Sequence, residues 1–231
     1  PHSGFITMGG AIRRFDNFAM KSWLETRTGL PVSVENDANC VLLAERWQGK
    51  AAEMANFLVL TIGTGIGGAI FCQHQLINGA RFRAGEFGYM LTDRPGGRDP
   101  RRYSMNENCT LRVLRHRYAQ HIGAPLDSVT GELIFDRYDA GDPVCQRLVA
   151  EFFNGLGHGL YNLVHIFDPQ TIFIGGGVVE RPGFLTLLRQ HLAWFGIADY
   201  LDTVSHGNDA GLIGAVYHFN QLYRSPDDDR H

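Results

Sequence analysis

The chain has 231 residues, of which 44% are hydrophobic, and its 21 Lys and Arg residues nearly balance 24 Asp and Glu residues, for a formal net charge of -3. This length is enough for one large domain or two small ones with a buried core, and we do not expect a mainly disordered chain. The lack of a long basic stripe argues against a nucleic-acid partner, and no run of about 18 apolar residues predicts a membrane span.

The first half of the chain alternates between predicted strands and helices. These elements are a strand within residues 4–10, a helix within 18–30, a strand over 31–36 and a helix within 37–50. Asp37 and Asn39 are candidates to cap the start of the last helix, and Gly49 is placed to end it. Residues 55–79 predict two strands around a glycine cluster, followed by a turn at Asn78 and Gly79.

The second half begins with a Pro-, Gly- and Arg-rich stretch, residues 93–104, which predicts a long surface loop. Asp142 and Pro143 are typical of a cap and a first helical position. The predicted elements are helices within 109–123 and 142–167, a strand, a triple glycine and a helix within 168–196, a helix within 209–224, and a solvated tail over 225–231.

Four cysteines, at positions 40, 72, 109 and 145, are far apart and form no CxxC pair. The sequence therefore predicts neither a zinc knuckle nor a disulfide framework. Because no secretory leader is evident either, we expect a soluble protein of the reducing cytoplasm. The chain starts at Pro1 without an initiator Met, in turn-like sequence, and we expect that an N-terminal piece is missing.

The stretch "TIGTGIGGAIF" contains Gly63, Gly65 and Gly68 in the GxGxxG spacing of dinucleotide-binding proteins. That fingerprint requires a helix directly afterwards, whereas this stretch continues with strand-forming residues. A Gly-rich turn between two strands can still present bare backbone N–H groups and the Thr64 hydroxyl to phosphate oxygens, because glycine permits positive φ and close approach. The alternative is a β-turn that binds nothing, and the number of glycines favours the phosphate site.

The stretch "VENDANC" places Asp37 where a predicted strand meets a helix, a position at which ligands collect in α/β proteins. Asp37 could act as a general base on a hydroxyl, with Asn36 and Asn39 binding neighbouring hydroxyls. Aspartate is also a favoured helix cap, so the residues alone leave both roles open.

Two further glycine-flanked segments are candidates for ligand contact. In "AGEFGYM", Glu86 has little side-chain cover and could reach a polyol, although an exposed loop glutamate is the commoner outcome. In "TIFIGGGVV", a strand runs into Gly175, Gly176 and Gly177, which could let a ribose or a base approach the backbone. The alternative there is a tight turn between a strand and a helix.

Taken in order, "PVSVENDANC", "FLVLTIGTGIGGAIF", "RAGEFGYM", "FDPQTIFIGGGVV" and "NDAGLIGAVYHF" resemble the ROK family of bacterial sugar kinases and sugar-responsive repressors over nearly the whole chain. The resemblance implies an α/β, actin-like ATPase (ribonuclease H-like) fold with two lobes. It implies ATP-dependent phosphorylation of a sugar hydroxyl with Mg²⁺. Within the family the chain looks most like members that phosphorylate O6 of the non-reducing glucose in cellobiose and related β-glucosides.

The resemblance also assigns roles to particular residues. They are Asp37 as the catalytic base, Asn36 and Glu86 as sugar ligands, Gly63, Thr64 and Gly65 at the ATP phosphates, and Gly176 and Gly177 beside the adenosine. A family repressor would instead carry a helix-turn-helix ahead of this sugar-binding domain, but the presence of Asp37 favours the kinase. An NAD-dependent enzyme rests on GxGxxG alone and is disfavoured.

The chain departs from the family pattern at several points. Gly88-Tyr89 replaces a glycine-histidine step, and Cys109 is the one cysteine in the region of the family's zinc loop, so no structural zinc is expected. Glu107 is the substitute we predict for the family's second sugar-binding glutamate. The family's first phosphate turn, Asp-x-Gly-Gly-Thr, is absent, so we expect an incomplete N-terminal lobe over residues 1–36 and a C-terminal lobe over 37–231. Family members are often dimers, so the resemblance also allows a homodimer.

Overall fold

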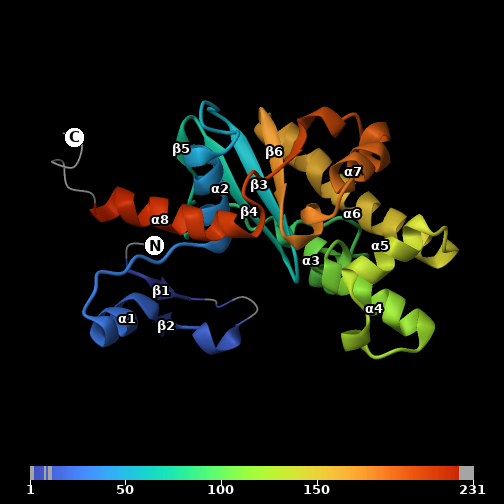
Figure 1. Cartoon of the computed structure of the whole chain (residues 1–231), viewed down its shortest axis with the longest axis horizontal. Helices are drawn as coiled ribbons and strands as arrows, with labels where there is room; N and C mark the ends of the chain where they lie inside the picture. The colour runs from blue at the N-terminus through green and yellow to red at the C-terminus, as the bar shows by residue number, and fades with distance from the viewer. Residues whose placement is uncertain (1–2, 8, 10–11, 224–231) are drawn as a thin grey trace.

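The computed structural model describes residues 3–7, 9 and 12–223, which form two β-sheets and their covering helices (Figure 1). The smaller sheet pairs β1 (Phe5–Ile6) antiparallel with β2 (Phe18–Ala19), and α1 (Met20–Thr28) follows directly. This N-terminal part lies below the larger sheet in Figure 1. The strand predicted within residues 4–10 is confirmed at β1, while Met8 and Gly10 lie outside the described residues.

The larger sheet has five strands in the order β5-β4-β3-β6-β7. Its strands are β3 (Phe57–Ile62), β4 (Ile66–Cys72), β5 (Gln75–Leu76), β6 (Thr171–Gly175) and β7 (Leu201–Thr203). β4 runs antiparallel to β3 and β5, whereas β3, β6 and β7 are parallel to one another. Thr61 is opposite Gly175, and Ile174 is opposite Thr203. The carboxyl ends of the three parallel strands therefore meet at one edge of the sheet.

Helices cover both faces of this sheet. On one face, α2 (Asp37–Gln48) contacts β3 and β4, and α8 (Ala210–Tyr223) packs on α2. The other face carries the main core, with the 25-residue helix α6 (Pro143–Phe167) at its centre. Its neighbours are α3 (Met105–Asn108), α4 (Leu111–Ile122), α5 (Gly131–Asp139) and α7 (Phe184–Leu192). The alternation along β3, Leu58 and Leu60 to one face and Phe57 and Val59 to the other, divides the two cores.

Short 3-10 turns link many of these elements. They lie at Arg13–Phe15, Phe87–Tyr89, Pro100–Tyr103, Leu126–Ser128, Gly177–Glu180, Ala193–Phe195, Ala198–Tyr200 and Gly207–Asp209. The long loop predicted over residues 93–104 is confirmed apart from the turn at Pro100–Tyr103.

The contact between α2 and α8 is unusually close because it includes a glycine. A Cβ atom on Gly214 of α8 would collide with the backbone carbonyl of Cys40 in α2, so this position accepts no larger side chain without a shift. At the far end of α2, the fully buried carboxylate of Glu45 accepts hydrogen bonds from the backbone N–H and the hydroxyl of Ser205 and from the backbone N–H of Lys50. Both contacts fix α2 against later parts of the chain.

Several sequence predictions need correction. The strand expected over residues 31–36 is wrong: this segment pairs with no strand among the described residues, and Val32 bonds to side chains of Lys21, Glu25 and Tyr223 instead. The sequence did not predict α5 or β7. A turn does follow, over residues 79–82 with Gly79 at φ 73 and Asn78 just before it, but the tight β4–β5 turn is made by Gln73 and His74, both at positive φ.

The predicted start of α6 is confirmed. Asp142 caps α6 by accepting hydrogen bonds from the N–H groups of Val144 and Cys145, and Pro143 is its first residue. All four cysteines are free thiols. Of the helices in the described part of the chain, none has the length and apolar character needed to cross a membrane. The tail predicted over residues 225–231 lies outside the described residues.

Candidate functional site

Two glycine clusters meet where the parallel strands β3 and β6 end. Gly63 follows β3, and Gly176 follows β6 with φ 96. A Cβ atom on Gly176 would collide with the carbonyl oxygen of Ile62, the last residue of β3. The backbone at Gly176 therefore lies directly against the start of the Gly63–Gly65 turn, and the structure brings together the two segments predicted to contact ATP.

The Gly63–Gly65 turn closes the β3–β4 hairpin and is open to solvent. The N–H of Gly63 donates to the carbonyl oxygen of Gly65 at 3.0 Å, and Thr64 at its tip is exposed. A Cβ atom would meet nothing within 4 Å at Gly63 or at Gly177. These bare backbone faces leave room for phosphate oxygens to approach N–H groups.

The glycines of this hairpin serve close approach and not left-handed backbone, since none of Gly63, Gly65, Gly67 and Gly68 has a positive φ. A Cβ atom on Gly67 would lie 2.6 Å from the hydroxyl of Thr61. One on Gly68 would collide with the ring of Phe87. Of the two properties of glycine, this turn uses close approach, because the missing side chains allow other segments to touch β4.

Helix α2 begins beside this hairpin, and Asn36 is its cap. The side-chain oxygen of Asn36 accepts hydrogen bonds from the N–H groups of Ala38 at 2.9 Å and Asn39 at 3.1 Å. The expectation that Asp37 or Asn39 caps the helix is therefore wrong. Asp37 occupies the first helical position, where its side chain is exposed and accepts only from the N–H of Ala38 among the described residues.

The start of α2 lies against the hairpin through Ala38, the residue after Asp37. The side chain of Ala38 is 3.5 Å from the place of a Cβ on Gly67 in β4. The start of a helix also carries the positive end of its dipole, which stabilises negative charge nearby. A carboxylate, an open Gly-rich turn and a helix start are thus brought to the same end of the sheet.

Glu86 is held over the same strand by tight backbone contacts. Gly85 has φ 86, and a Cβ atom there would collide with the carbonyl of Gly68. The residue after Glu86, Phe87, is buried against Gly68. Glu86 itself is exposed between these two anchors, so its carboxylate is free to reach a ligand while its backbone is fixed.

The side chain next to Glu107 is the one that contacts the turn. Asn106 accepts a hydrogen bond from the N–H of Ile66 at 2.8 Å, and Gly88 packs against its amide. Glu107 forms an ion pair with Arg112 at 3.1 Å and is about half exposed. Its role as a sugar ligand stays a prediction. Asn106, which sequence reasoning missed, ties the Gly63–Gly65 turn to the segment that carries Glu86.

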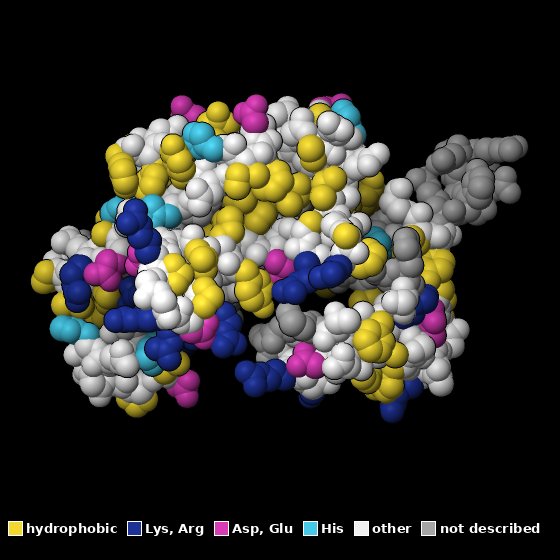
Figure 2. All heavy atoms as spheres, turned by 180° about the vertical axis from the view of Figure 1, so that it is seen from behind, with side chains coloured by type: hydrophobic (Ala, Val, Ile, Leu, Met, Phe, Trp, Pro, Cys, Tyr) yellow, Lys and Arg dark blue, Asp and Glu magenta, His cyan; other side chains and the backbone are white. Residues whose placement is uncertain are grey.

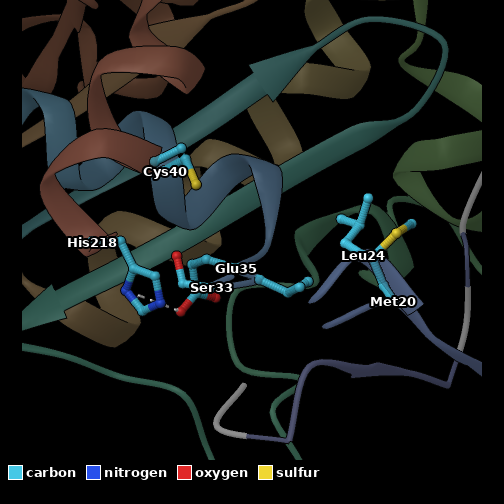
Figure 3. A pocket seen from close by; sticks show the side chains of 8 residues that line it. Met20, Leu24, Ser33, Glu35, Cys40 and His218 are labelled. Carbon is cyan, nitrogen blue, oxygen red and sulfur yellow. Dashed lines mark ion pairs between the residues drawn. The ribbon is translucent and has the colours of Figure 1, made fainter. Parts of the chain in front are cut away.

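Sequence reasoning also missed the polar groups behind Asp37. Glu35 accepts hydrogen bonds from the backbone N–H of Asn36 and the side-chain amide of Asn39, and its other oxygen lies 3.9 Å from Nδ1 of His218 in α8. Figure 3 shows the Glu35 and His218 side chains turned toward each other at one side of a cavity of about 260 Å³. Glu35 stands out in the sequence only as part of the motif "VEN", and nothing in the sequence connected it with His218.

A second cavity, of about 720 Å³, lies between the segment Leu91–Arg94, α6 and the turn after α7. Aromatic residues line it, including Tyr161, Trp194 and Phe195. It contains none of the predicted site residues. On the rear face, Figure 2 shows the surface hollowed at its lower edge beside the N-terminal part, with Lys and Arg side chains near the hollow.

An α/β sheet with helices on both faces, Gly-rich turns at the ends of its parallel strands and an exposed carboxylate at a helix start are features that suit a nucleotide-dependent phosphotransferase. The family model described as the ROK family matches residues 2–221, and the chain belongs to that family. A β-glucoside kinase of Listeria innocua serovar 6a is 59% identical over 222 residues, which are 96% of this chain and 76% of that protein.

Two solved structures extend the comparison. A Listeria monocytogenes protein, provisionally assigned as an N-acetylmannosamine kinase, is 57% identical and superposes with a TM-score of 0.89, covering 96% of this chain and 77% of that one. A ROK glucokinase of Streptomyces griseus, solved with glucose and AMPPNP, is 24% identical with a TM-score of 0.78, over 94% and 77% of the two chains. The chain has the fold of the ROK sugar kinases and is a carbohydrate kinase. A repressor is not favoured.

Proposed function

We propose that the protein transfers a phosphoryl group from ATP to O6 of the non-reducing glucose of cellobiose or related β-glucosides, with Asp37 as the general base. One observation carries the proposal: Asn36 caps α2, so the carboxylate of Asp37 is left exposed at a helix start whose next residue, Ala38, lies against Gly67 of the β3–β4 hairpin. The similarity to a β-glucoside kinase supports the substrate.

The open backbone at the two glycine clusters fits a nucleotide. A missing Cβ leaves space at Gly63 and Gly177, and Thr64 adds an exposed hydroxyl. In the proposal, Gly63, Thr64 and Gly65 hold the phosphates while Gly176 and Gly177 flank the adenosine. When bound, ATP supplies the phosphoryl group and Mg²⁺ neutralises the charge on the phosphate oxygens. The described residues contain no group of three or more His, Cys, Asp or Glu placed to bind a metal, so we propose that Mg²⁺ binds mainly through the phosphates.

The protein's own residues then position and deprotonate the sugar. Asp37 accepts the proton of the sugar hydroxyl at its exposed carboxylate. Asn36 can bind a neighbouring hydroxyl through its amide N–H₂, because its oxygen is already engaged by the helix start. Glu86 and, as predicted from sequence, Glu107 are assigned to further hydroxyls. Positioning of this kind supplies most of the rate in phosphoryl transfer.

The proposal also includes the predicted division near residue 37, a cytoplasmic location, the absence of a structural zinc and a homodimer. The free thiols of all four cysteines are compatible with a reducing compartment. Sedimentation of the purified protein would test the dimer.

The substrate is tested by measuring sugar phosphate formed from Mg·ATP with cellobiose, glucose, fructose and N-acetylmannosamine in parallel. We expect the highest kcat/KM with cellobiose and a product whose phosphate is on O6 of the non-reducing ring by NMR. Preference for N-acetylmannosamine would overturn the β-glucoside assignment but keep the kinase. No product with any sugar would count against the proposed activity of this protein.

A further inference from the structure

Glu35 is a buried carboxylate two positions before Asp37. Its side chain is 5% exposed, although it lies in the segment between α1 and α2, outside both helices. A buried carboxylate is stable only where it is hydrogen-bonded or paired. Its partners therefore indicate what it does.

One oxygen of Glu35 holds both flanks of Asp37. Oε1 accepts from the backbone N–H of Asn36 at 2.7 Å and from the side-chain Nδ2 of Asn39 at 2.9 Å. Asn39 is itself buried in the first turn of α2. Because hydrogen bonds to a charged acceptor are roughly twice as strong as neutral ones, this oxygen fixes the residue before Asp37 and the turn after it.

The other oxygen faces α8. Oε2 lies 3.9 Å from Nδ1 of His218, whose side chain is 16% exposed, and the two side chains point toward each other (Figure 3). The residues lining this cavity include one further titratable group, Cys40, and burial raises the pKa of its thiol to about 12, so it stays neutral. From α1 the cavity receives only Met20 and Leu24, which carry no charge. Apart from the thiol of Cys40 and the hydroxyl of Ser33, the imidazole of His218 is the polar side-chain group that lines this cavity with Glu35.

We propose that Glu35 is a positioning residue for Asp37, which holds the catalytic carboxylate at a fixed place by joining the start of α2 to His218 of α8. This inference rests on the proposed role of Asp37. Glu35 does not touch the substrate. Its charge strengthens both hydrogen bonds to Oε1, whereas glutamine would keep that acceptor but remove the charge and turn an N–H₂ toward His218.

The test is a double-mutant cycle with Glu35→Gln and Asp37→Asn in the active kinase. Glu35→Gln alone is expected to lower kcat about tenfold or more, since small displacements of a catalytic group have effects of this size, with KM for ATP unchanged. In the Asp37→Asn background the same change should have no further effect on kcat, because the group that it positions is gone. Multiplicative losses would overturn the proposal.

Glu25→Gln is the matched control. Glu25 is also a carboxylate of this region, bonded to Lys21 at 2.6 Å and to the N–H of Val32 at 3.2 Å, but it has no contact with the start of α2 among the described residues. It should leave kcat within about twofold of wild type, and an equal loss would show a general effect of the region and overturn the proposal.

If Glu35→Gln does not unfold cooperatively, His218→Gln replaces it in the cycle. We expect a smaller loss of kcat that also vanishes in the Asp37→Asn background, and a loss that persists would again overturn the inference. Near-normal turnover by Asp37→Asn alone would instead overturn the proposed function, so the two failures are distinguishable.

Discussion

The side chain of Asn36 caps α2 and leaves the carboxylate of Asp37, the next residue, exposed at the helix start. Asparagine and aspartate are both favoured caps, so either could have taken this place. The structure gives the capping role to Asn36, and the role of Asp37 as a base stays a prediction.

Asp37→Asn should lower kcat by roughly 10²–10⁴, the usual contribution of a general base, while sugar binding changes little. The substitution keeps the shape of the side chain and the acceptor for Ala38. Product formation gives kcat, and calorimetric titration with cellobiose gives the binding. Turnover within a few-fold of wild type would contradict the role of Asp37 as base.

At Asn36, two substitutions separate the cap from the proposed sugar contact. Asn36→Ala should lose about 1 kcal/mol of stability, because the N–H of Asn39 loses its acceptor and the N–H of Ala38 keeps only that of Asp37. Asn36→Ser keeps a cap but has no amide N–H₂, so it should unfold near the wild-type temperature and yet show a raised KM for sugar. An unchanged KM for sugar in the Asn36→Ser variant would remove Asn36 from the sugar site.

Gly176→Ala should damage the site, since φ is 96 and a Cβ would collide with the carbonyl of Ile62. We expect a loss of about 1–3 kcal/mol in stability, the range for strained backbone, and a raised KM for ATP. Gly177→Ala is the matched control for folding: its φ is not positive and a Cβ there meets nothing within 4 Å. Thermal unfolding gives the melting temperatures of the two variants, and equal values would contradict the predicted strain at Gly176.

Alkaline pH should destabilise the fold through buried thiols. Burial raises the pKa of both Cys40 and Cys109 from 9.0 to about 12. Above pH 9 the unfolded chain loses these protons while the folded protein keeps them, so the free energy of unfolding should fall between pH 9 and 12. The limit is about 1.4 kcal/mol per pH unit for each thiol. Urea unfolding of wild type and of Cys40→Ala/Cys109→Ala measures the slope, which should be shallower in the variant.

Glu45→Gln should cost about 1–3 kcal/mol, because an amide N–H₂ would face the donors of Ser205 and Lys50 that now bond to the carboxylate. For a protein of this size the melting temperature should fall by roughly 2–4 °C per kcal/mol. Glu53→Gln, at an exposed position, is the control and should change little. Equal melting temperatures for the two variants would show that the buried carboxylate is not structural.

Local patterns were sufficient to predict much of the fold. The glycine-centred hairpin, the capped start of α6 and the strand before Gly176 each follow from neighbouring residues. The strand predicted over residues 31–36 is wrong because alternation predicts only an extended backbone. A strand also needs a partner strand, which local sequence does not specify. β7, with only three residues, owes its strand character to pairing with β6.

The sequence predicted candidate site residues only where they lie in short, recognisable motifs. Asp37, Thr64 and Glu86 lie in short motifs, but Asn106 and His218 contact the site from segments distant in sequence. Their side chains are of types that occur at many positions without any role. Contacts of this kind follow from the packing of α3 and α8, which the sequence did not reveal.

The glycine contact between α8 and α2 has a consequence for biosynthesis. Asp37 and Cys40 leave the ribosome long before Gly214, the residue of α8 that packs against the backbone of Cys40. Both edges of the central strand β3 are likewise paired only after β6 has been synthesised. We therefore expect a nascent chain stalled before residue 210 to be inactive and to become active only once α8 has emerged. Chaperones that bind the chain before then would bind it with the start of α2 not yet fixed.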